Sequence, residues 1–327
     1  MFHHILVPLD GSDRAERALP VATHIARTCG GTILLLSVVT PMPAYTGTLA
    51  ASTQMTGPVL EQDYKETTCY LKTMAKSEKL AGVPVITEVV YGSAAQAILE
   101  YAQKQEIDLV VMCSHGRTGF KRWVLGSVAH RLVHQSSIPV LVLNEREPGD
   151  ILPRTETKHP FRVFVPLDGS PLAEKAILPA AHLAVALAAP MRGAVHLAQV
   201  VQIYPSTTTG SFVDAFNEQT LETGRDYLAH LVERLQTTMN DLKLTFSWSI
   251  ACENGEADVA ITLLNMAEHG EPGKQENMEA GKGVGDLIAI STHGRDTLER
   301  WVLGSVTERL LNSTRLPMLI IPPHKIG

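Results

Sequence analysis

The sequence predicts an α/β protein made of two repeated doubly wound domains, each with a five-stranded parallel sheet and helices on both faces. The first observation is a repeat: SHGRTGFKRWVLGSVAHRL at 114–132 returns as THGRDTLERWVLGSVTERL at 292–310. The second is that both halves open alike, with ILVPLDGS at 5–12 and VFVPLDGS at 163–170. The third is that short apolar runs alternate with helical patterns, which favours parallel strands joined by right-handed crossovers. The chain therefore contains one unit twice.

Length, charge and cysteine content narrow the class of protein. A chain of 327 residues suggests about two domains. The net charge of −6 and the pI of about 6.1 provide no basic surface, so nucleic acid is not expected as a partner. The four cysteines have no CxxC spacing, which argues against a zinc knuckle or a disulfide scaffold.

The apolar segments of the sequence do not favour a membrane protein. The start, MFHHILVPLDG, has no basic region and no long apolar core, so it does not resemble a signal peptide. The longest apolar run, Ala176–Met191, contains two prolines and is shorter than the roughly 20 residues that span a bilayer. We expect it to form a largely buried helix in a soluble, cytoplasmic protein.

The first half is expected to begin with a buried strand that ends in Asp10-Gly11-Ser12, a turn and a helix N-cap. The helix AERALPVATHIA follows, and a longer helix is expected over Leu60–Leu80. The other four strands are expected at Thr32–Val39, Val85–Val90, Asp108–Met112 and Ile138–Leu143.

The second half repeats this order, with the helices AEKAILPAAHLA and Val213–Leu235. Its strands are expected to start at Val163 and to continue at Ala194–Gln202, Leu244–Ile250, Asp286–Ile290 and Leu316–Ile321. A polar, glycine-rich insertion, Gly270–Gly285, is expected to form a loop. The predicted domains are 1–146 and 160–327, joined by a linker at 147–159 that is charged, proline-rich and without periodicity.

Small residues and glycines follow the fourth strand, where ligands of doubly wound folds bind. Gly116 can adopt a positive φ and lets a ligand approach the backbone. Ser127 is expected to cap the helix Val128–Gln135, whose first N–H groups and dipole favour phosphate. Asp10 would reach the same crevice from the first strand. Its carboxylate could accept from an adenine amino group or a ribose, or help to hold a metal.

This pattern resembles the universal stress protein family, whose nucleotide-binding members carry Gly-x2-Gly-x9-Gly-(Ser/Thr). Both halves match in full length, so the resemblance covers nearly the whole chain as a tandem protein. It implies a strand order of 3-2-1-4-5, with the ligand crevice between the first and fourth strands. It also implies a stress-responsive regulatory protein that binds ATP or a related adenine nucleotide, with or without Mg²⁺.

The resemblance assigns equivalent nucleotide contacts to both halves. At the adenosine end of the first half it places Asp10, Val38, Met112 and Cys113. At the phosphates it places Gly116, Gly126, Ser127 and Val128. The corresponding residues of the second half are Asp168, Val200, Ile290, Ser291, Gly294, Gly304, Ser305 and Val306.

Two departures from the family pattern affect this assignment. Cys113 and Ser291 replace the first glycine of the motif, so a backbone contact there survives only if φ is negative. In the second half, Asp296 and Glu299 stand where the first half has Thr118 and Lys121. Two added carboxylates oppose a triphosphate, although solvent screening limits the penalty. We therefore favour the first half as the stronger site.

Each candidate residue also has a purely structural interpretation. The glycines and Ser127 could form a plain strand–turn–helix corner, and Asp10 and Asp168 could be turn aspartates. His115 and His293 could orient phosphate, act as a base or make a structural hydrogen bond. His130 and His134 have helical spacing but no third metal ligand, so a solvated face is favoured over a metal site. Cys113 could be a redox switch, but a buried strand-end thiol is usually inert.

Three functions remain in competition: a nucleotide-binding regulator, an interaction scaffold with empty pockets, and a slow ATPase or self-phosphorylating protein. The chain has no Walker lysine and no evident general base with an orienting partner, so we expect no enzyme, no catalytic residue and no metal centre. The resemblance implies that the two halves form an intrachain pseudo-dimer through Ile138–Leu143 and Leu316–Ile321. Association of two chains into a homodimer stays open.

Overall fold

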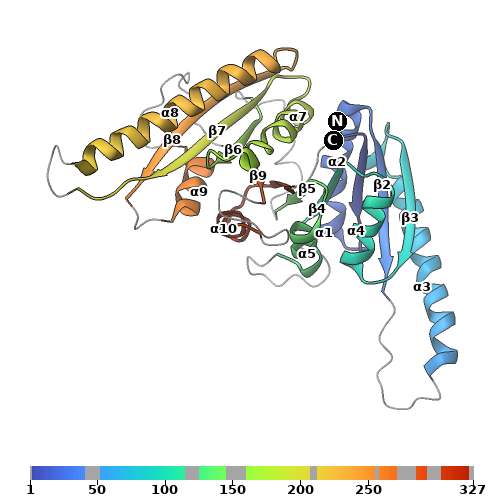
Figure 1. Cartoon of the computed structure of the whole chain (residues 1–327). Helices are drawn as coiled ribbons and strands as arrows, with labels where there is room; N and C mark the ends of the chain where they lie inside the picture. The colour runs from blue at the N-terminus through green and yellow to red at the C-terminus, as the bar shows by residue number, and fades with distance from the viewer. Residues whose placement is uncertain are drawn as a thin grey trace. The chain divides into compact units, whose positions relative to one another are not determined.

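The computed structural model describes residues 2–40, 52–114, 125–144, 160–206, 212–254, 258–270, 285–292 and 303–323. The backbone contacts divide the chain into two compact units, residues 1–148 and 149–327 (Figure 1). Each unit is an α/β structure with five parallel strands. Several predicted features lie outside the described residues. They are Gly116, Gly294, the acidic residues Asp296 and Glu299, and residues 271–284 of the predicted loop.

The first unit contains a five-stranded parallel sheet with the order β3-β2-β1-β4-β5. The strands are β1 (His4–Pro8), β2 (Thr32–Val39), β3 (Val85–Tyr91), β4 (Leu109–Cys113) and β5 (Val140–Leu143). The helices are α1 (Asp13–Glu16), α2 (Ala18–Cys29), α3 (Ser52–Ala75), the 3-10 turn η1 (Glu78–Leu80), α4 (Ala94–Lys104) and α5 (Ser127–Gln135).

The second unit repeats this arrangement with the order β8-β7-β6-β9-β10, again parallel. The strands are β6 (Arg162–Leu167), β7 (Gly193–Gln202), β8 (Leu244–Glu253), β9 (Leu287–Ser291) and β10 (Met318–Ile321). The helices are α6 (Pro171–Glu174), α7 (Ile177–Ala188), α8 (Phe212–Thr238), α9 (Val259–His269) and α10 (Ser305–Ser313). The predicted fold class and the predicted order 3-2-1-4-5 are thus confirmed in both units.

The helix predicted after each Asp-Gly-Ser turn is divided in two. In the first unit α1 is a single turn, and α2 restarts at Ala18 after Arg17. Pro20 explains the division, because proline has no N–H to donate to the carbonyl four residues earlier and its ring crowds that carbonyl. Restarting the helix places Pro20 in the first turn, where the missing N–H costs nothing. Pro179 has the same position in α7.

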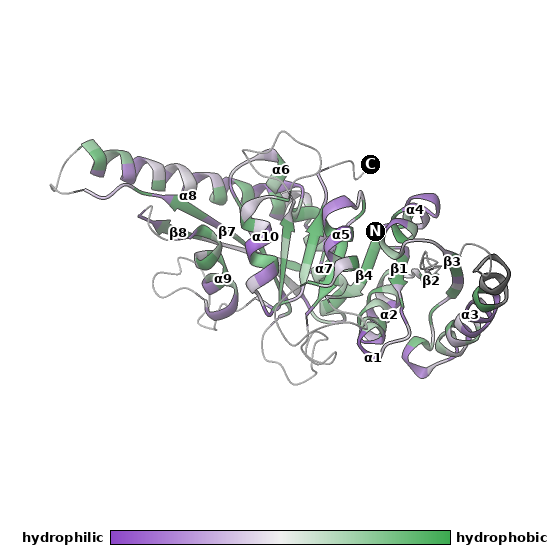
Figure 2. Ribbon diagram, turned by 90° about the horizontal axis from the view of Figure 1, so that it is seen from below, coloured by the Kyte–Doolittle hydropathy of each residue, from purple (hydrophilic) through white to green (hydrophobic). Residues whose placement is uncertain are grey.

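The core of each unit lies between its strands and helices, and the inner residues of the central strands, 5–7 in β1 and 163–167 in β6, are buried. The apolar stretch Pro171–Ala188 has the length and composition of a membrane span, but 61% of it is buried inside the fold. Figure 2 shows α7 as largely hydrophobic, in contrast to the mixed surfaces of α3 and α8. This is the buried helix that was predicted from Ala176–Met191, ending at Ala188.

A glycine stands at the start of the second strand of each unit, before β2 as Gly31 and as the first residue of β7 as Gly193, because two backbones meet there. A Cβ atom on Gly31 would lie 2.7 Å from the carbonyl oxygen of Phe2. A Cβ atom on Gly193 would lie 2.6 Å from the carbonyl oxygen of Ala184 in α7. Real Cβ contacts of this kind are essentially absent from proteins, so both positions require glycine.

Candidate functional site

A pocket of about 190 Å³ lies at the carboxyl ends of β1 and β4 in the first unit. Seven of the eight residues assigned to this half line it: Asp10, Val38, Met112, Cys113, Gly126, Ser127 and Val128. The eighth, Gly116, lies outside the described residues. The structure therefore brings together residues that are more than 100 positions apart in the sequence, at the crevice where strand order reverses.

The pocket has a mixed lining of apolar and polar residues. Its apolar residues include several that the sequence did not single out: Pro8, Leu9, Ala15, Leu36, Ala94, Ile98 and Ala129. They come from β1 and the residue after it, α1, β2, α4 and α5. Met112 is buried, while Ser127 at the start of α5 is exposed. An amphiphilic ligand with an apolar ring and an anionic end fits a lining of this kind.

The start of α5 differs from the expectation that Ser127 is its N-cap. Gly126 is the N-cap, with φ −59 and ψ 149, and Ser127 is the first helical residue. The N–H group of Gly126 donates to the carbonyl of Ser114 at 2.8 Å, and its own carbonyl accepts from the N–H of His130 at 2.8 Å. This closure of the loop starts the helix one residue earlier than predicted. The prediction of Ser127 as N-cap was wrong, and α5 has no side-chain cap hydrogen bond.

The Asp10 carboxylate takes part in a tight turn. Its Oδ1 accepts from the N–H of Ser12 at 3.0 Å and from the Ser12 hydroxyl at 2.6 Å. Ser12 Oγ then accepts from the N–H of Ala15 at 3.2 Å and caps α1. Gly11 between them has φ 79, which glycine adopts without strain. Asp10 thus has the turn role proposed as its structural interpretation, and it also lines the pocket.

The motif positions occupied by Cys113 and Ser291 do not require glycine in this fold. Both residues end a strand, β4 and β9 respectively. Within the described ranges, Glu106 is the single non-glycine residue with a positive φ. A side chain at these positions therefore costs no backbone strain, and a ligand could still contact the main chain.

The Cys113 thiol is expected to be the least reactive toward alkylation among Cys69, Cys113 and Cys252. Burial raises the pKa of Cys113 to about 12, because it outweighs the lowering effect of the Arg17 charge, and the Asp10 carboxylate adds a smaller rise. Because the thiolate is the nucleophile, the thiol of Cys113 stays protonated and inert near pH 8. Cys69 and Cys252 are exposed. Iodoacetamide labelling at pH 8, followed by peptide mass spectrometry, measures the three rates. Labelling of Cys113 as fast as Cys69 would contradict this expectation.

The second unit places its assigned residues at the equivalent positions. Asp168 follows β6, Val200 is in β7, Ile290 and Ser291 end β9, and Gly304, Ser305 and Val306 open α10. Oδ1 of Asp168 accepts from the N–H of Ser170 at 2.8 Å, as in the first unit. Gly304 is the N-cap of α10, so Ser305 is again the first helical residue instead of the cap.

One side-chain hydroxyl distinguishes the candidate site of the second unit from that of the first. Thr307 is buried, and its Oγ1 donates to the carbonyl of Ser291 at 3.1 Å. The first unit has Ala129 at that position of the repeat, so the carbonyl of Cys113 receives no such side-chain bond from α5. In the second unit the Ser291 carbonyl therefore already accepts a side-chain hydrogen bond from the protein.

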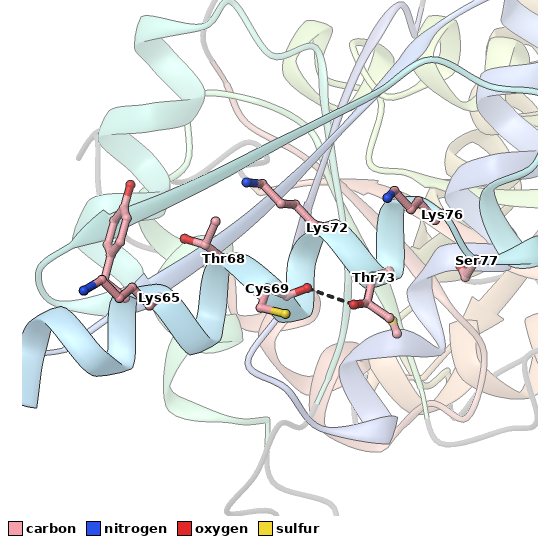
Figure 3. A pocket seen from close by; sticks show the side chains of 9 residues that line it. Lys65, Thr68, Cys69, Lys72, Thr73, Lys76 and Ser77 are labelled. Carbon is pink, nitrogen blue, oxygen red and sulfur yellow. Dashed lines mark hydrogen bonds between the residues drawn. The ribbon is translucent and has the colours of Figure 1, made fainter.

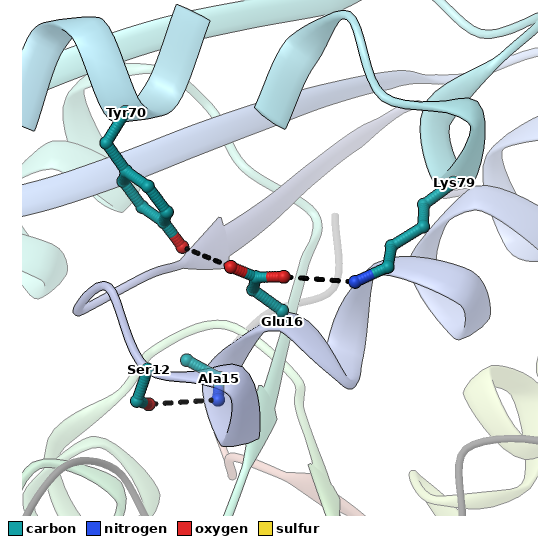
Figure 4. Close-up of polar contacts among 5 residues, drawn as sticks. All are labelled: Ser12, Ala15, Glu16, Tyr70 and Lys79. Atoms are coloured by element: carbon teal, nitrogen blue, oxygen red, sulfur yellow. Dashed lines mark hydrogen bonds and ion pairs between the residues drawn. The ribbon is translucent and has the colours of Figure 1, made fainter. Parts of the chain in front are cut away.

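A cluster that the sequence analysis missed lies beside the pocket. The Glu16 carboxylate at the end of α1 accepts from the Tyr70 hydroxyl at 3.1 Å and pairs with Lys79 Nζ at 3.0 Å (Figure 4). Burial, followed by the charge of Glu16, raises the pKa of Tyr70, so this hydroxyl remains a neutral donor. We call Glu16, Tyr70 and Lys79 the first clasp.

The second unit has the same cluster. Glu174 accepts from the Tyr227 hydroxyl at 3.0 Å and pairs with Arg234 at 2.6 Å. We call Glu174, Tyr227 and Arg234 the second clasp. Aligning the two halves could have found it, because Glu16 and Glu174 share one position in AERA and AEKA, and a tyrosine follows each at similar distance.

An open groove of about 850 Å³ runs along α3 and is separate from the assigned residues (Figure 3). Its lining comes from one helix face and the turn that follows: Tyr64, Lys65, Thr68, Cys69, Lys72, Thr73, Met74, Lys76 and Ser77. Lys65 forms an i,i+4 ion pair with Glu61 at 2.7 Å. The groove contains none of the residues that sequence reasoning placed in the ligand site.

Metal-ligating side chains do not gather at either site within the described ranges, where no group of three or more His, Cys, Asp or Glu could hold an ion. The rings of His130 and His134 on α5 lie with centroids 4.2 Å apart and are tilted by 33°. His130 is exposed, as the expected solvated face requires, whereas His134 is only partly exposed and its Nε2 atom is buried.

Comparison with known proteins gives matches along both halves. The model of the universal stress protein family matches residues 1–144 and 161–322. A universal stress protein of Methanocaldococcus jannaschii is 32% identical over 145 residues, 44% of this chain and 84% of the relative. One of Mycolicibacterium smegmatis is 25% identical over 330 residues, 98% of this chain and 97% of the relative.

The solved structures extend the match to the fold of the whole chain. The crystal structure of a universal stress protein from Archaeoglobus fulgidus superposes with a TM-score of 0.61 at 15% identity, covering 99% of this chain and 100% of that chain. At this identity the likeness concerns the fold alone.

Proposed function

The chain belongs to the universal stress protein family, and on that premise we propose that it is a stress-responsive regulator whose first unit binds ATP or a related adenine nucleotide. The observation that carries the proposal is the pocket between β1 and β4, lined by seven of the residues that the family pattern assigns to the nucleotide. Interaction scaffolding without a ligand is the alternative.

The pocket's size and polarity support a division of the nucleotide between two environments. A volume of about 190 Å³ is smaller than a site that encloses a whole nucleotide. We propose that the base lies against Val38 and Met112, and that the ribose lies near Asp10. The phosphates would extend over the start of α5, where the N–H groups of Ser127 and Val128 and the helix dipole favour an anion. Mg²⁺ would accompany the phosphates.

We propose that the second unit binds nucleotide more weakly. The hydrogen bond from Thr307 to the Ser291 carbonyl supports this difference, because a ribose hydroxyl would have to compete for that acceptor. The acidic residues Asp296 and Glu299 of its sequence act in the same direction by opposing phosphate charge.

Addition of MgATP to the purified protein is expected to raise its melting temperature. A ligand at 100 times its Kd stabilises the folded state by about 2.7 kcal/mol, which corresponds to a shift of several degrees for a domain of this size. Differential scanning fluorimetry measures the shift, and acid extraction followed by chromatography identifies nucleotide that copurifies. Absence of both a shift and extracted nucleotide would favour the scaffold and contradict nucleotide binding.

We propose binding without designed turnover, since the chain has no Walker lysine and Oδ1 of Asp10, the carboxylate among the described pocket residues, is already engaged by the N–H and hydroxyl of Ser12. Steady release of phosphate that is lost in a His115→Ala variant would contradict this.

We also propose the domain boundaries 1–146 and 160–327, and pairing of Ile138–Leu143 with Leu316–Ile321 within the chain. Cleavage of the 147–159 linker followed by gel filtration tests whether the halves remain together.

A further inference from the structure

The first clasp is connected to the wall of the pocket by a short chain of contacts. Glu16 ends α1, and Ala15, the residue before it, lines the pocket. The N–H of Ala15 donates to Ser12 Oγ, and the N–H and hydroxyl of Ser12 donate to Asp10. The Asp10 turn and the Glu16 carboxylate therefore stand at the two ends of one helical turn.

A helix of one turn does not hold its position by its own hydrogen bonds. Nucleation of a helix is unfavourable, and a segment of four residues gains almost nothing from propagation. The division at Arg17 also separates α1 from the regular hydrogen bonding of α2. Contacts with other elements must therefore help to fix α1, and α3 and η1 provide two polar ones through Tyr70 and Lys79.

We propose that Glu16 and Tyr70 are positioning residues for the nucleotide pocket, holding the turn that carries Asp10 in its binding geometry. This inference rests on the proposed function for its ligand, but not for the geometry itself. Tyr70 and Lys79 bind separate oxygens of one carboxylate, so the direction of Glu16 is fixed from two sides. The side chain of Glu16 is only 15% exposed, which leaves little water to replace a lost partner.

The second clasp supports a shared role and provides a matched control. The same tyrosine–glutamate bond recurs between Tyr227 and Glu174, beside the turn of Asp168. Each clasp acts within its own unit. The pair Tyr70→Phe and Tyr227→Phe therefore removes one hydroxyl from equivalent places, with effects that are expected in different units.

Hydrogen exchange of the ligand-free full chain tests the positioning itself. Tyr70→Phe is expected to increase exchange in a peptide that covers residues 10–18, and to leave the peptide covering 168–176 unchanged. Tyr227→Phe is expected to do the reverse. Equal exchange of the 10–18 peptide in wild type and Tyr70→Phe overturns the proposal, whether or not the protein binds nucleotide.

Titration with MgATP tests the consequence for the pocket. The titration uses a Gly304→Asp background, in which the new charge at the start of α10 prevents binding by the second unit. In that background Tyr70→Phe is expected to raise the Kd by about 3- to 10-fold, the effect of losing one hydrogen bond to a partly screened charge. Tyr227→Phe in that background is expected to leave the Kd unchanged. An unchanged Kd in Tyr70→Phe overturns the role in binding, whereas a background protein that binds no MgATP contradicts the proposed function.

Discussion

Replacing Gly126 with Asp is expected to abolish nucleotide binding by the first unit while leaving the unit folded. Gly126 is the N-cap of α5, a position that Asp fills well, with its carboxylate accepting from the next free N–H groups. Those are the groups that the proposed phosphates would use. The new negative charge also repels phosphate at close range, so we expect an affinity loss of about 100-fold or more.

Calorimetric titration with MgATP measures this loss, and thermal unfolding without ligand checks the fold. Gly126→Ser is the control for size, because serine adds a side chain at the cap without the charge. It should lose less affinity than Gly126→Asp. Gly304→Asp places the same change in the second unit and should preserve the tighter binding event. A Gly126→Asp protein that binds MgATP as tightly as wild type would remove the α5 terminus from the site.

Replacing Gly193 with Ala is expected to destabilise the second unit by about 1–3 kcal/mol, the typical cost of overpacking. The new Cβ would lie 2.6 Å from the carbonyl oxygen and 2.8 Å from the carbonyl carbon of Ala184. These are backbone atoms of α7, so no side-chain rotation relieves the contact. Nine of the residues of α7 are buried, and a shift of the helix therefore disturbs the core around it.

Denaturant unfolding followed by hydrogen exchange of β7 peptides measures the effect in the unit concerned, since a two-unit chain need not unfold in one step. Gly31→Ala should have a similar effect in the first unit, because its Cβ meets the Phe2 carbonyl oxygen at 2.7 Å. Gln236→Ala, an exposed change on α8, should have almost none. A Gly193→Ala protein as stable as the Gln236→Ala protein would mean that α7 adjusts without cost.

Sequence reasoning predicted the sheet well because its patterns are local and occur twice. The apolar run Thr32–Val39 has the same bounds in the structure, and the other predicted strands for which both ends were given differ by one to three residues at an end. The limits of helices were harder, because they depend on single hydrogen bonds. Pro20 divides the first helix, and the bond between Gly126 and the Ser114 carbonyl moves the start of α5 by one residue.

The candidate site shows the same contrast between local and tertiary information. The glycine pattern and the Asp10 turn can be recognised in the sequence. Seven of the eight residues assigned to the first unit line one pocket. The contact of Glu16 with Tyr70 joins residues 54 positions apart, and nothing in either segment alone predicts it. Alignment of the two halves shows that Thr307 corresponds to Ala129. That its hydroxyl donates to the carbonyl of Ser291 is known only from the fold.

The division of the first helix at Arg17 has a consequence for how this protein can change over evolutionary time. The part after the division, α2, has seven buried residues. The part before it, α1, has one, Ala15, and its Glu16 contacts α3 and η1 through polar bonds. A mutation in α1 therefore disturbs fewer buried side chains than a mutation in α2. Because the chain carries this short segment twice, the two copies can diverge independently.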